Sequence, residues 1–222
     1  MKEQLQKDFD NSIKNLSLSQ KDIEIKKFCL DNFIDKGFPN KKEEDWKFSD
    51  LNQIIKNNIG ELSFYNDQAS TNKVDTSVFV DGLEHNKIVF INGRIEKIDF
   101  DYEKKDQIEI IDQSETINEF KNSNSLSDLN NAFTNKCFKI LVKKGYQLVK
   151  PLIIYHTTNS KIWSKNINLR LNFELDKDSS LRLIDLFNDT SQKNFLNIFY
   201  NFELKENAVL KNYKVDKFEN KN

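Results

Sequence analysis

The side chains best suited to chemistry are few in this sequence and lie far apart. There are two cysteines, Cys29 and Cys137, and two histidines, His85 and His156. Neither cysteine has a second cysteine or a histidine at metal-ligand spacing, and both lie among apolar neighbours. Such a thiol is either a small buried hydrophobe or a metal or sulfur ligand, and the isolation of these two favours the first interpretation. We therefore expect no metal-binding residue in this chain.

Catalytic and nucleotide-binding motifs are absent from the sequence as well. It contains no glycine-rich phosphate loop, no G-x-S-x-G nucleophile motif and no H-E-x-x-H zinc motif, and it has only 5 glycines. Carboxylate pairs such as Glu43 and Glu44 lie in a segment of mixed charge, which is typical of a solvated surface rather than an acid–base site. We expect no catalytic and no cofactor-binding residue, and we expect the chain not to be an enzyme.

The charge balance argues against two classes of partner. Lys and Arg number 34 against 35 Asp and Glu, which gives a net charge of -1, and the two signs are interspersed. A chain without a basic excess has no general attraction to nucleic acid or to an anionic membrane. The N-terminus lacks the apolar core of a signal peptide, and no apolar run approaches the length of a membrane span. We expect a cytoplasmic protein that binds neither nucleic acid nor membrane.

Helical patterns dominate the N-terminal part. Apolar residues from Leu5 to Leu16 have helical spacing, and a second helix is predicted to begin at Gln20, with Ser19 as its N-cap, and to end at Gly37. The expected apolar face of this second helix consists of Ile23, Phe28, Leu30, Phe33 and Ile34.

An aromatic pair, Trp46 and Phe48, follows within a dense run of charged residues, before a short helix predicted over residues 51–59. We interpret the pair as an anchor for an irregular segment, onto a core or onto a partner. If the Trp46 ring is fully buried, its replacement by alanine costs about 3 kcal/mol.

Strand patterns begin near residue 87. Residues 87–91 and 94–100 flank Asn92-Gly93, the strongest short hairpin pattern. A further strand over residues 107–111 precedes helical patterns at residues 114–121 and 126–133. We therefore assign residues 1–135 to a helical or α+β N-terminal domain.

Residues 136–222 have a different character, because strand patterns follow one another with almost no helical spacing. The predicted strands cover residues 138–142, 151–157, 167–175, 181–187, 195–204 and 209–215.

An internal repeat links three of the turns between these strands. Gly145, Asp178 and Asn207 occupy the same place in three copies of a pattern: an apolar strand end, two polar residues, the turn residue and a return to Leu. Gly, Asp and Asn accept positive φ most readily, so the shared position has one physical role. Recurring units of short strands and turns predict a β-solenoid, in which each unit stacks on the next. The alternative is a β-sandwich whose hairpins look alike.

Several ordered motifs resemble one known family. Residues 37–51 (GFPNKKEEDWKFSDL), residues 88–94 (IVFINGR) and residues 129–133 (LNNAF), with residues 142–145 and 150–152 downstream, are similar to the N-terminal half of SufD subunits in the SufB/SufD family. Members of this family are scaffold subunits of the SUF machinery, which assembles iron–sulfur clusters.

The resemblance implies a fold, partners and a role. It implies that the N-terminal domain leads into a right-handed parallel β-helix, of which residues 136–222 form the first turns. It also implies a SufB-like paralogue and a SufC-like ATPase as partners. The cluster is built at the level of the assembled complex, so this chain alone binds no cofactor.

The match covers only the N-terminal half of the family. The later β-helix turns and the C-terminal helical domain, which hold the interface histidine and the surface for the ATPase, have no counterpart in these residues. We therefore assign no cluster ligand to this chain.

Two other interpretations remain open. A β-helix can be a carbohydrate-active enzyme, which requires carboxylates clustered on one face, whereas Glu174 and Glu203 recur as repeat positions and look structural. The chain can also be a nonfunctional gene fragment. In a truncated solenoid the strand over residues 209–215 is expected to leave the stack open, which favours a homo-oligomer or aggregate through that end.

Overall fold

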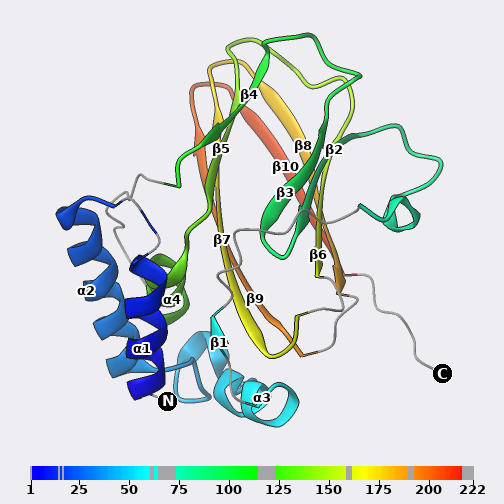
Figure 1. Cartoon of the computed structure of the whole chain (residues 1–222). Coiled ribbons are helices and arrows are strands. Elements are labelled where there is room, and N and C mark those ends of the chain that lie inside the picture. Colours follow the sequence, from blue (N-terminus) through cyan, green and yellow to red (C-terminus); the bar gives the residue numbers. More distant parts are fainter. Residues whose placement is uncertain are drawn as a thin grey trace, which may run out of the picture.

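The computed structural model describes a mixed α/β protein with four α-helices and two mixed β-sheets among the described residues (Figure 1). No described helix combines the length and the apolar character needed to cross a bilayer. The described residues are 2–14, 16, 18–60, 63–64, 74–114, 124–158, 162–189 and 193–216.

The helices form a layer beside one sheet. They are α1 (Lys2–Ile13), α2 (Gln20–Lys36), α3 (Leu51–Asn58) and α4 (Ser125–Phe133). A helical core joins α1, α2 and α4, and its most buried members are Phe9, Leu30, Phe33, Leu129 and Ala132. Figure 1 shows these three helices side by side at one edge of the molecule.

Helix α2 begins and ends where the sequence predicts. The side chain of Ser19 accepts a hydrogen bond from the backbone N–H of Asp22, and Gly37 ends the helix with a φ of 72°. The predicted apolar face is wrong at Phe28, whose side chain is 65% exposed. The buried stripe instead consists of Lys26, Cys29, Leu30 and Phe33. A search for apolar residues alone misses this stripe, because one of its buried positions is a lysine.

The first sheet, called sheet A, packs against this helical layer. Its order is β4 (Ile108–Asp112), β5 (Cys137–Val142), β7 (Lys165–Leu175) and β9 (Phe195–Leu204), with the short β1 (Ser63–Phe64) beside the start of β7. Only the β4–β5 pair is antiparallel. Helix α4 is tied to this sheet by the Nδ2 of Asn130, which donates to the carbonyl oxygens of Leu169 and Asn197.

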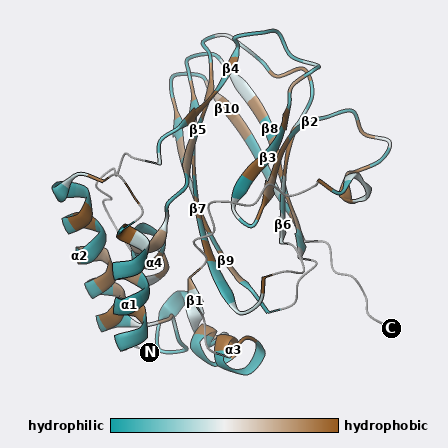
Figure 2. Cartoon of the chain, in the orientation of Figure 1, coloured by the Kyte–Doolittle hydropathy of each residue, from teal (hydrophilic) through white to brown (hydrophobic). Residues whose placement is uncertain are grey.

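The second sheet, called sheet B, has the order β3 (Arg94–Asp99), β2 (Asn86–Ile91), β6 (Leu152–Thr158), β8 (Ser180–Asp189) and β10 (Val209–Asp216). Only the predicted hairpin, β2–β3, is antiparallel. Figure 2 shows hydrophilic and hydrophobic residues mixed along the strands, and in β2 and β6 consecutive apolar residues are buried on both faces. The inward residues of both sheets form the main core, which includes Ile88, Ile140, Leu152, Phe173 and Leu183.

From β5 onward the chain passes back and forth between the sheets. β5, β7 and β9 are parallel neighbours in sheet A, and β6, β8 and β10 are parallel neighbours in sheet B. From β7 onward, each strand therefore pairs with the strand two places earlier in the chain. Strands β2 and β4, which precede residue 136, share the core with strands that follow it.

The three predicted turn residues stack on one another. Gly145, Asp178 and Asn207 have φ values of 72°, 59° and 57°. The N–H of Gly145 donates to the carbonyl oxygen of Lys177 at 2.8 Å, and the N–H of Asp178 donates to that of Glu206 at 3.0 Å. The Nδ2 of Asn207 also donates to the Asp178 carboxylate at 2.9 Å. The common role expected for these residues is confirmed, whereas the coiling of the two sheets into a solenoid stays a prediction.

The remaining predictions have mixed outcomes. Trp46 ends a short 3-10 helix, η1 (Glu44–Trp46), and is only half-buried, while Phe48 is 87% exposed. The full burial assumed for a cost of about 3 kcal/mol at Trp46 is therefore absent. Nearly all of the helix predicted over residues 114–121 lies outside the described residues.

Replacing Gly145 by alanine tests the turn. A Cβ at this position meets no atom within 4 Å, so any effect comes from the positive φ alone. We expect Gly145→Ala to lower the free energy of unfolding by about 1 kcal/mol, measured by urea denaturation. Gly145→Asn is the matched control and should lose less, because asparagine tolerates this conformation. Equal stability of the alanine variant and the native protein would contradict a strained corner.

Candidate functional site

Both cysteines are buried, as the sequence predicts. Cys29 on α2 and Cys137 at the start of β5 are each 6% exposed. Burial raises the pKa of both thiols, which keeps them protonated and poor nucleophiles. Within the described residues, no group of three or more His, Cys, Asp or Glu side chains is placed to hold a metal ion.

Two buried cations near these thiols have structural partners. The Nζ of Lys26 donates to the carbonyl oxygens of Asn131 and Thr134, at 3.1 and 2.6 Å, and so caps the C-terminal end of α4. Burial, followed by the nearby charge of Arg170, lowers the pKa of Lys26 to about 8. The Arg170 guanidinium lies 4.4 Å from the centre of the Phe199 ring. Lys26 thus joins α2 to α4 within the helical layer, and Arg170 on β7 lies against β9 within sheet A.

The outer face of sheet B is the most distinctive surface of the described chain. A segment over residues 74–83, called the strap, crosses it and contains the 3-10 helix η2 (Thr76–Val78). The strap contributes Val74, Val78, Phe79 and Val80 to a small apolar cluster on this face. Its partners on the sheet are Val89, Ile91, Ile153, Tyr155 and Leu186, all of them buried.

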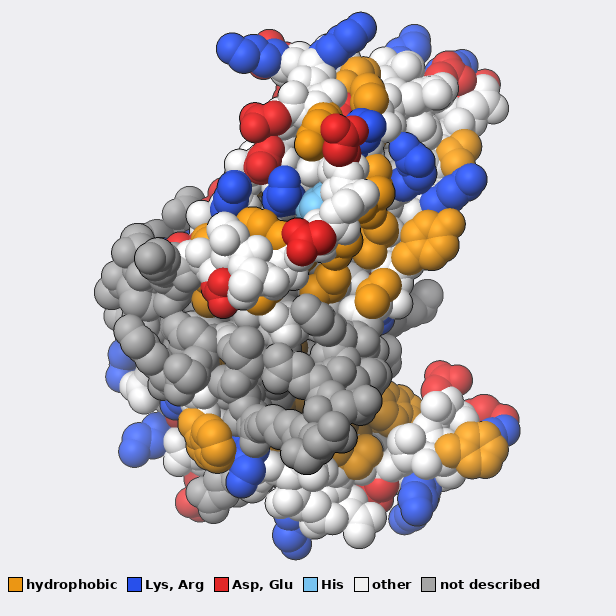
Figure 3. All heavy atoms as spheres, turned by 90° about the vertical axis from the view of Figure 1, so that its right-hand side faces the viewer, with side chains coloured by type: hydrophobic (Ala, Val, Ile, Leu, Met, Phe, Trp, Pro, Cys, Tyr) orange, Lys and Arg blue, Asp and Glu red, His pale blue; other side chains and the backbone are white. Residues whose placement is uncertain are grey.

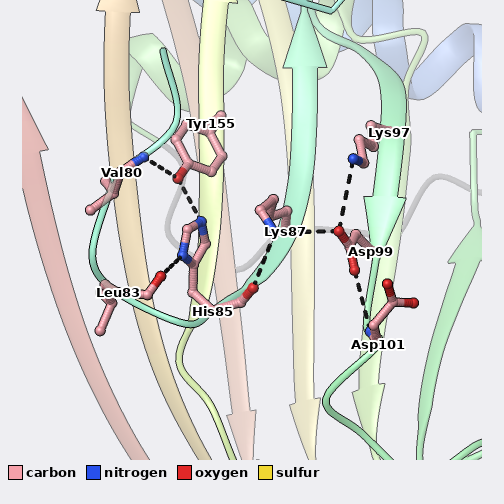
Figure 4. Close-up of polar contacts among 8 residues, drawn as sticks. All are labelled: Val80, Leu83, His85, Lys87, Lys97, Asp99, Asp101 and Tyr155. Carbon is pink, nitrogen blue, oxygen red and sulfur yellow. Dashed lines mark hydrogen bonds and ion pairs between the residues drawn. The ribbon is translucent and has the colours of Figure 1, made fainter. Parts of the chain in front are cut away.

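A chain of hydrogen bonds holds the strap to the sheet (Figure 4). The Nδ1 of His85 lies 2.5 Å from the carbonyl oxygen of Leu83, which can only accept, so Nδ1 carries the proton. The Nε2 therefore accepts from the Tyr155 hydroxyl at 2.7 Å, and that hydroxyl accepts from the N–H of Val80 at 3.1 Å. Burial lowers the pKa of His85, which is 3% exposed, and so favours the neutral form, in which the Tyr155 hydroxyl donates to Nε2.

Charged side chains flank this chain of hydrogen bonds. The Asp99 carboxylate lies 3.3 Å from the Nζ of Lys87 and 3.8 Å from that of Lys97. Burial alone raises the pKa of Asp99, but the N–H of Asp101 and the two lysines outweigh it and lower that pKa. Both lysines also lie over the Phe79 ring, at 6.0 and 5.7 Å from its centre. The strap is thus held by apolar, aromatic and cationic contacts together.

A second polar group lies between the two sheets. His156 on β6 is stacked between the rings of Phe90 and Phe187, with centroids 5.5 and 4.8 Å away. Its Nε2 is 2.7 Å from the Tyr200 hydroxyl, which donates in turn to the carboxylate of Asp185. His156 and Asp185 are almost fully buried, so the group has no open access for a substrate.

Sequence reasoning treated His85 and His156 as isolated, and the structure gives each a partner network. Their side-chain partners, Tyr155 for His85 and Tyr200 with Asp185 for His156, lie far away in the chain, and no local spacing reveals them. The ring partners of His156 become evident only from the register of the strands, in which Phe90, His156 and Phe187 are aligned neighbours on β2, β6 and β8. Neither network pairs a nucleophile with an accessible base, and both stabilise packing.

The comparisons with known proteins add no relative. A scan of the chain against protein-family models gives no match, and a search of the curated proteins gives none either.

The two histidines predict how stability depends on pH. Burial lowers the pKa of His85 and of His156, so both are neutral in the native state. The unfolded chain takes up protons near the ordinary histidine pKa of about 6.5, while the native protein resists. Stability is therefore full above that pH and falls below it, by at most about 1.4 kcal/mol per pH unit for each histidine.

Urea denaturation between about pH 7.5 and pH 5.5 measures this slope. We expect the double variant His85→Gln with His156→Gln to lose much less stability over that range than the native chain does. The readout is the slope and not the absolute stability, which the substitutions also change. Equal slopes in the two proteins would show that neither histidine is held neutral.

Proposed function

We propose that this chain is a non-catalytic, SufD-like scaffold component of the SUF complex that assembles iron–sulfur clusters. The proposal combines the motif resemblance with the course of the strands. Residues 88–94, one of the motifs, form the end of β2 and the turn into β3, and residues 129–133 close α4. Residues 129–133 therefore lie just before β5, the first of the parallel strands in sheet A, and residues 88–91 lie beside β6, the first of those in sheet B.

The proposed fold of β5 to β10 is the first part of a right-handed parallel β-helix. The observation that carries this proposal is the stack of Gly145, Asp178 and Asn207, in which each corner lies on the next. Parallel pairing of every second strand fits a coiling chain, whereas the hairpins of a sandwich pair consecutive strands antiparallel.

The free edges of the two sheets support an assembly role. Among the described residues no strand pairs with the outer edge of β9 or of β10. Leu204 on β9 and Val209 on β10 are each 49% exposed. Tyr200 and Phe202 on β9 pack against the main core but are themselves only partly buried. Unpaired backbone groups beside apolar side chains are suited to strand addition by another chain.

The proposed partner at this end is a SufB-like β-helix subunit, and a SufC-like ATPase is proposed to drive the complex. The cluster belongs to the assembled complex, and we assign no ligand for it to this chain. A second copy of the chain is a further occupant of the open end. We also propose a cytoplasmic location, with no direct contact to nucleic acid or membrane.

The enzyme alternative has less support. Glu174 on the outer face of sheet A contacts the Nζ atoms of Lys139 and Lys205, and these two lysines lower its pKa. A general acid in a glycosidase needs a raised pKa, so Glu174 is suited to holding neighbouring strands together instead. The gene-fragment alternative is decided by whether the DNA after codon 222 encodes further β-helix turns.

Co-purification tests the scaffold role. An affinity-tagged chain expressed in its own cells should retain a SufB-like and a SufC-like protein, identified by mass spectrometry. In β10 the N–H of Val209 donates to the carbonyl oxygen of Ser179, just before β8, so strand alternation turns the N–H of Asn212 to the free edge. Asn212→Pro removes that donor and should reduce recovery of the SufB-like protein roughly ten-fold.

Asn212→Thr keeps the N–H and serves as the matched control, with recovery close to that of the native chain. Recovery of neither partner by the native chain would count against the scaffold role and leave the enzyme alternative.

The isolated chain is expected to associate with itself through the open end. Sedimentation velocity at rising concentration should show dimers or larger species, because the free edges of β9 and β10 attract other strands. The same proline substitution should shift the distribution toward monomer. A monodisperse monomer at all concentrations would contradict self-association through the free edges of β9 and β10.

A further inference from the structure

The strap covers only part of an apolar band on the outer face of sheet B. Two rows of side chains run across the strands in register. One row joins Tyr155, Leu186 and Val215, and the other joins Ile153, Ile184 and Tyr213. The apolar cluster beneath the strap includes the members on β6 and β8. The band continues onto β10 without a break.

The β10 part of the band is open among the described residues. Val209, Tyr213 and Val215 are 49%, 56% and 45% exposed. Strand alternation turns these three side chains to the outer face, while Leu210 packs into the main core. Figure 3, which faces this side of the molecule, shows hydrophobic side chains gathered in a strip with lysine and arginine side chains at its border.

The charges beside this open part have one sign. Lys211 and Arg182 are aligned neighbours on β10 and β8, and alternation places them on the same face as Tyr213. Arg182 donates to the carbonyl oxygen of Val149, and no described carboxylate pairs with either cation. An occupant of the open band is therefore favoured if it carries negative charge.

The strap itself shows what this face accepts. Its sequence over residues 74–81 is VDTSVFVD, in which large apolar side chains lie between Asp75 and Asp81. Phe79 packs under two lysines on the covered half of the band, and the open half offers the same combination of apolar surface and cations. An internal segment of matching chemistry thus occupies the adjacent part of one continuous surface.

We propose that the outer face of β8 and β10, beside the strap, binds an extended segment of a partner protein that carries large apolar side chains flanked by Asp or Glu. The segment lies flat on the face, as the strap does, and leaves the free edge of β10 available. This surface is independent of the SUF assignment, because it is argued from the strap and the band alone.

A labelled peptide tests the surface on the full chain. The probe is a fluorescein-tagged peptide with the sequence of residues 74–81, and fluorescence anisotropy measures its binding. We expect saturable binding that Tyr213→Ser and Lys211→Glu each weaken roughly ten-fold. Ile111→Ser is the matched control: this exposed residue lies on β4 in the other sheet, and the change should be less than about two-fold.

A charge exchange adds a test that misfolding cannot imitate. A peptide with lysine at both aspartate positions should bind the native chain roughly ten-fold more weakly than the original peptide does. Its affinity should be restored on the variant Arg182→Glu with Lys211→Glu. Sedimentation velocity checks that each variant keeps the association state of the native chain.

Absence of saturable binding would overturn the proposal, as would equal affinity in the Tyr213 and Lys211 variants. It is also overturned if Phe79→Ala, which loosens the strap, strengthens peptide binding, since the peptide would then occupy the site of the strap itself. Failure of the co-purification experiment leaves the proposal untouched.

Discussion

The structure depends on one backbone constraint, a turn that needs positive φ at three places in the chain. Gly145, Asp178 and Asn207 each meet this need at low cost, and each is hydrogen-bonded to a neighbouring unit. Because the corners stack, the strands that enter them are in register: Val142, Leu175 and Leu204 are aligned in sheet A. The parallel sheets follow from this alignment.

Parallel stacking also explains where polar groups are tolerated. Aligned positions place Phe90, His156 and Phe187 in one column, and Asp185 and Tyr200 satisfy the histidine between the sheets. On the outside, the same alignment produces two continuous apolar rows on sheet B, one through Tyr155, Leu186 and Val215 and one through Ile153, Ile184 and Tyr213. Such rows suit the proposed scaffold role, because they give a partner a long regular surface.

Much of the fold was predictable, because strands and corners are local features. The strand limits, the N-cap at Ser19 and the equivalence of the three turn residues follow from spacing and from the residues that accept positive φ. The strap and the partners of His156 were not predictable. The first corner is longer than the second, because residues 148–151 lie between the turn and the start of β6. The spacing of the turns in the sequence therefore does not give the register between β6 and β8. Exposure of Phe28 was missed because Lys26 replaces an apolar residue in the buried stripe.

Disulfide trapping tests most directly whether the corners bring successive units together. Arg182 and Lys211 are opposite one another on β8 and β10, and cysteines at these positions satisfy the Cα spacing of a disulfide. Under mild oxidation the pair Arg182→Cys with Lys211→Cys should cross-link within one chain, whereas Arg182→Cys with Val215→Cys, which is out of register, should not. Equal cross-linking of both pairs, or of neither, would contradict the stacked arrangement.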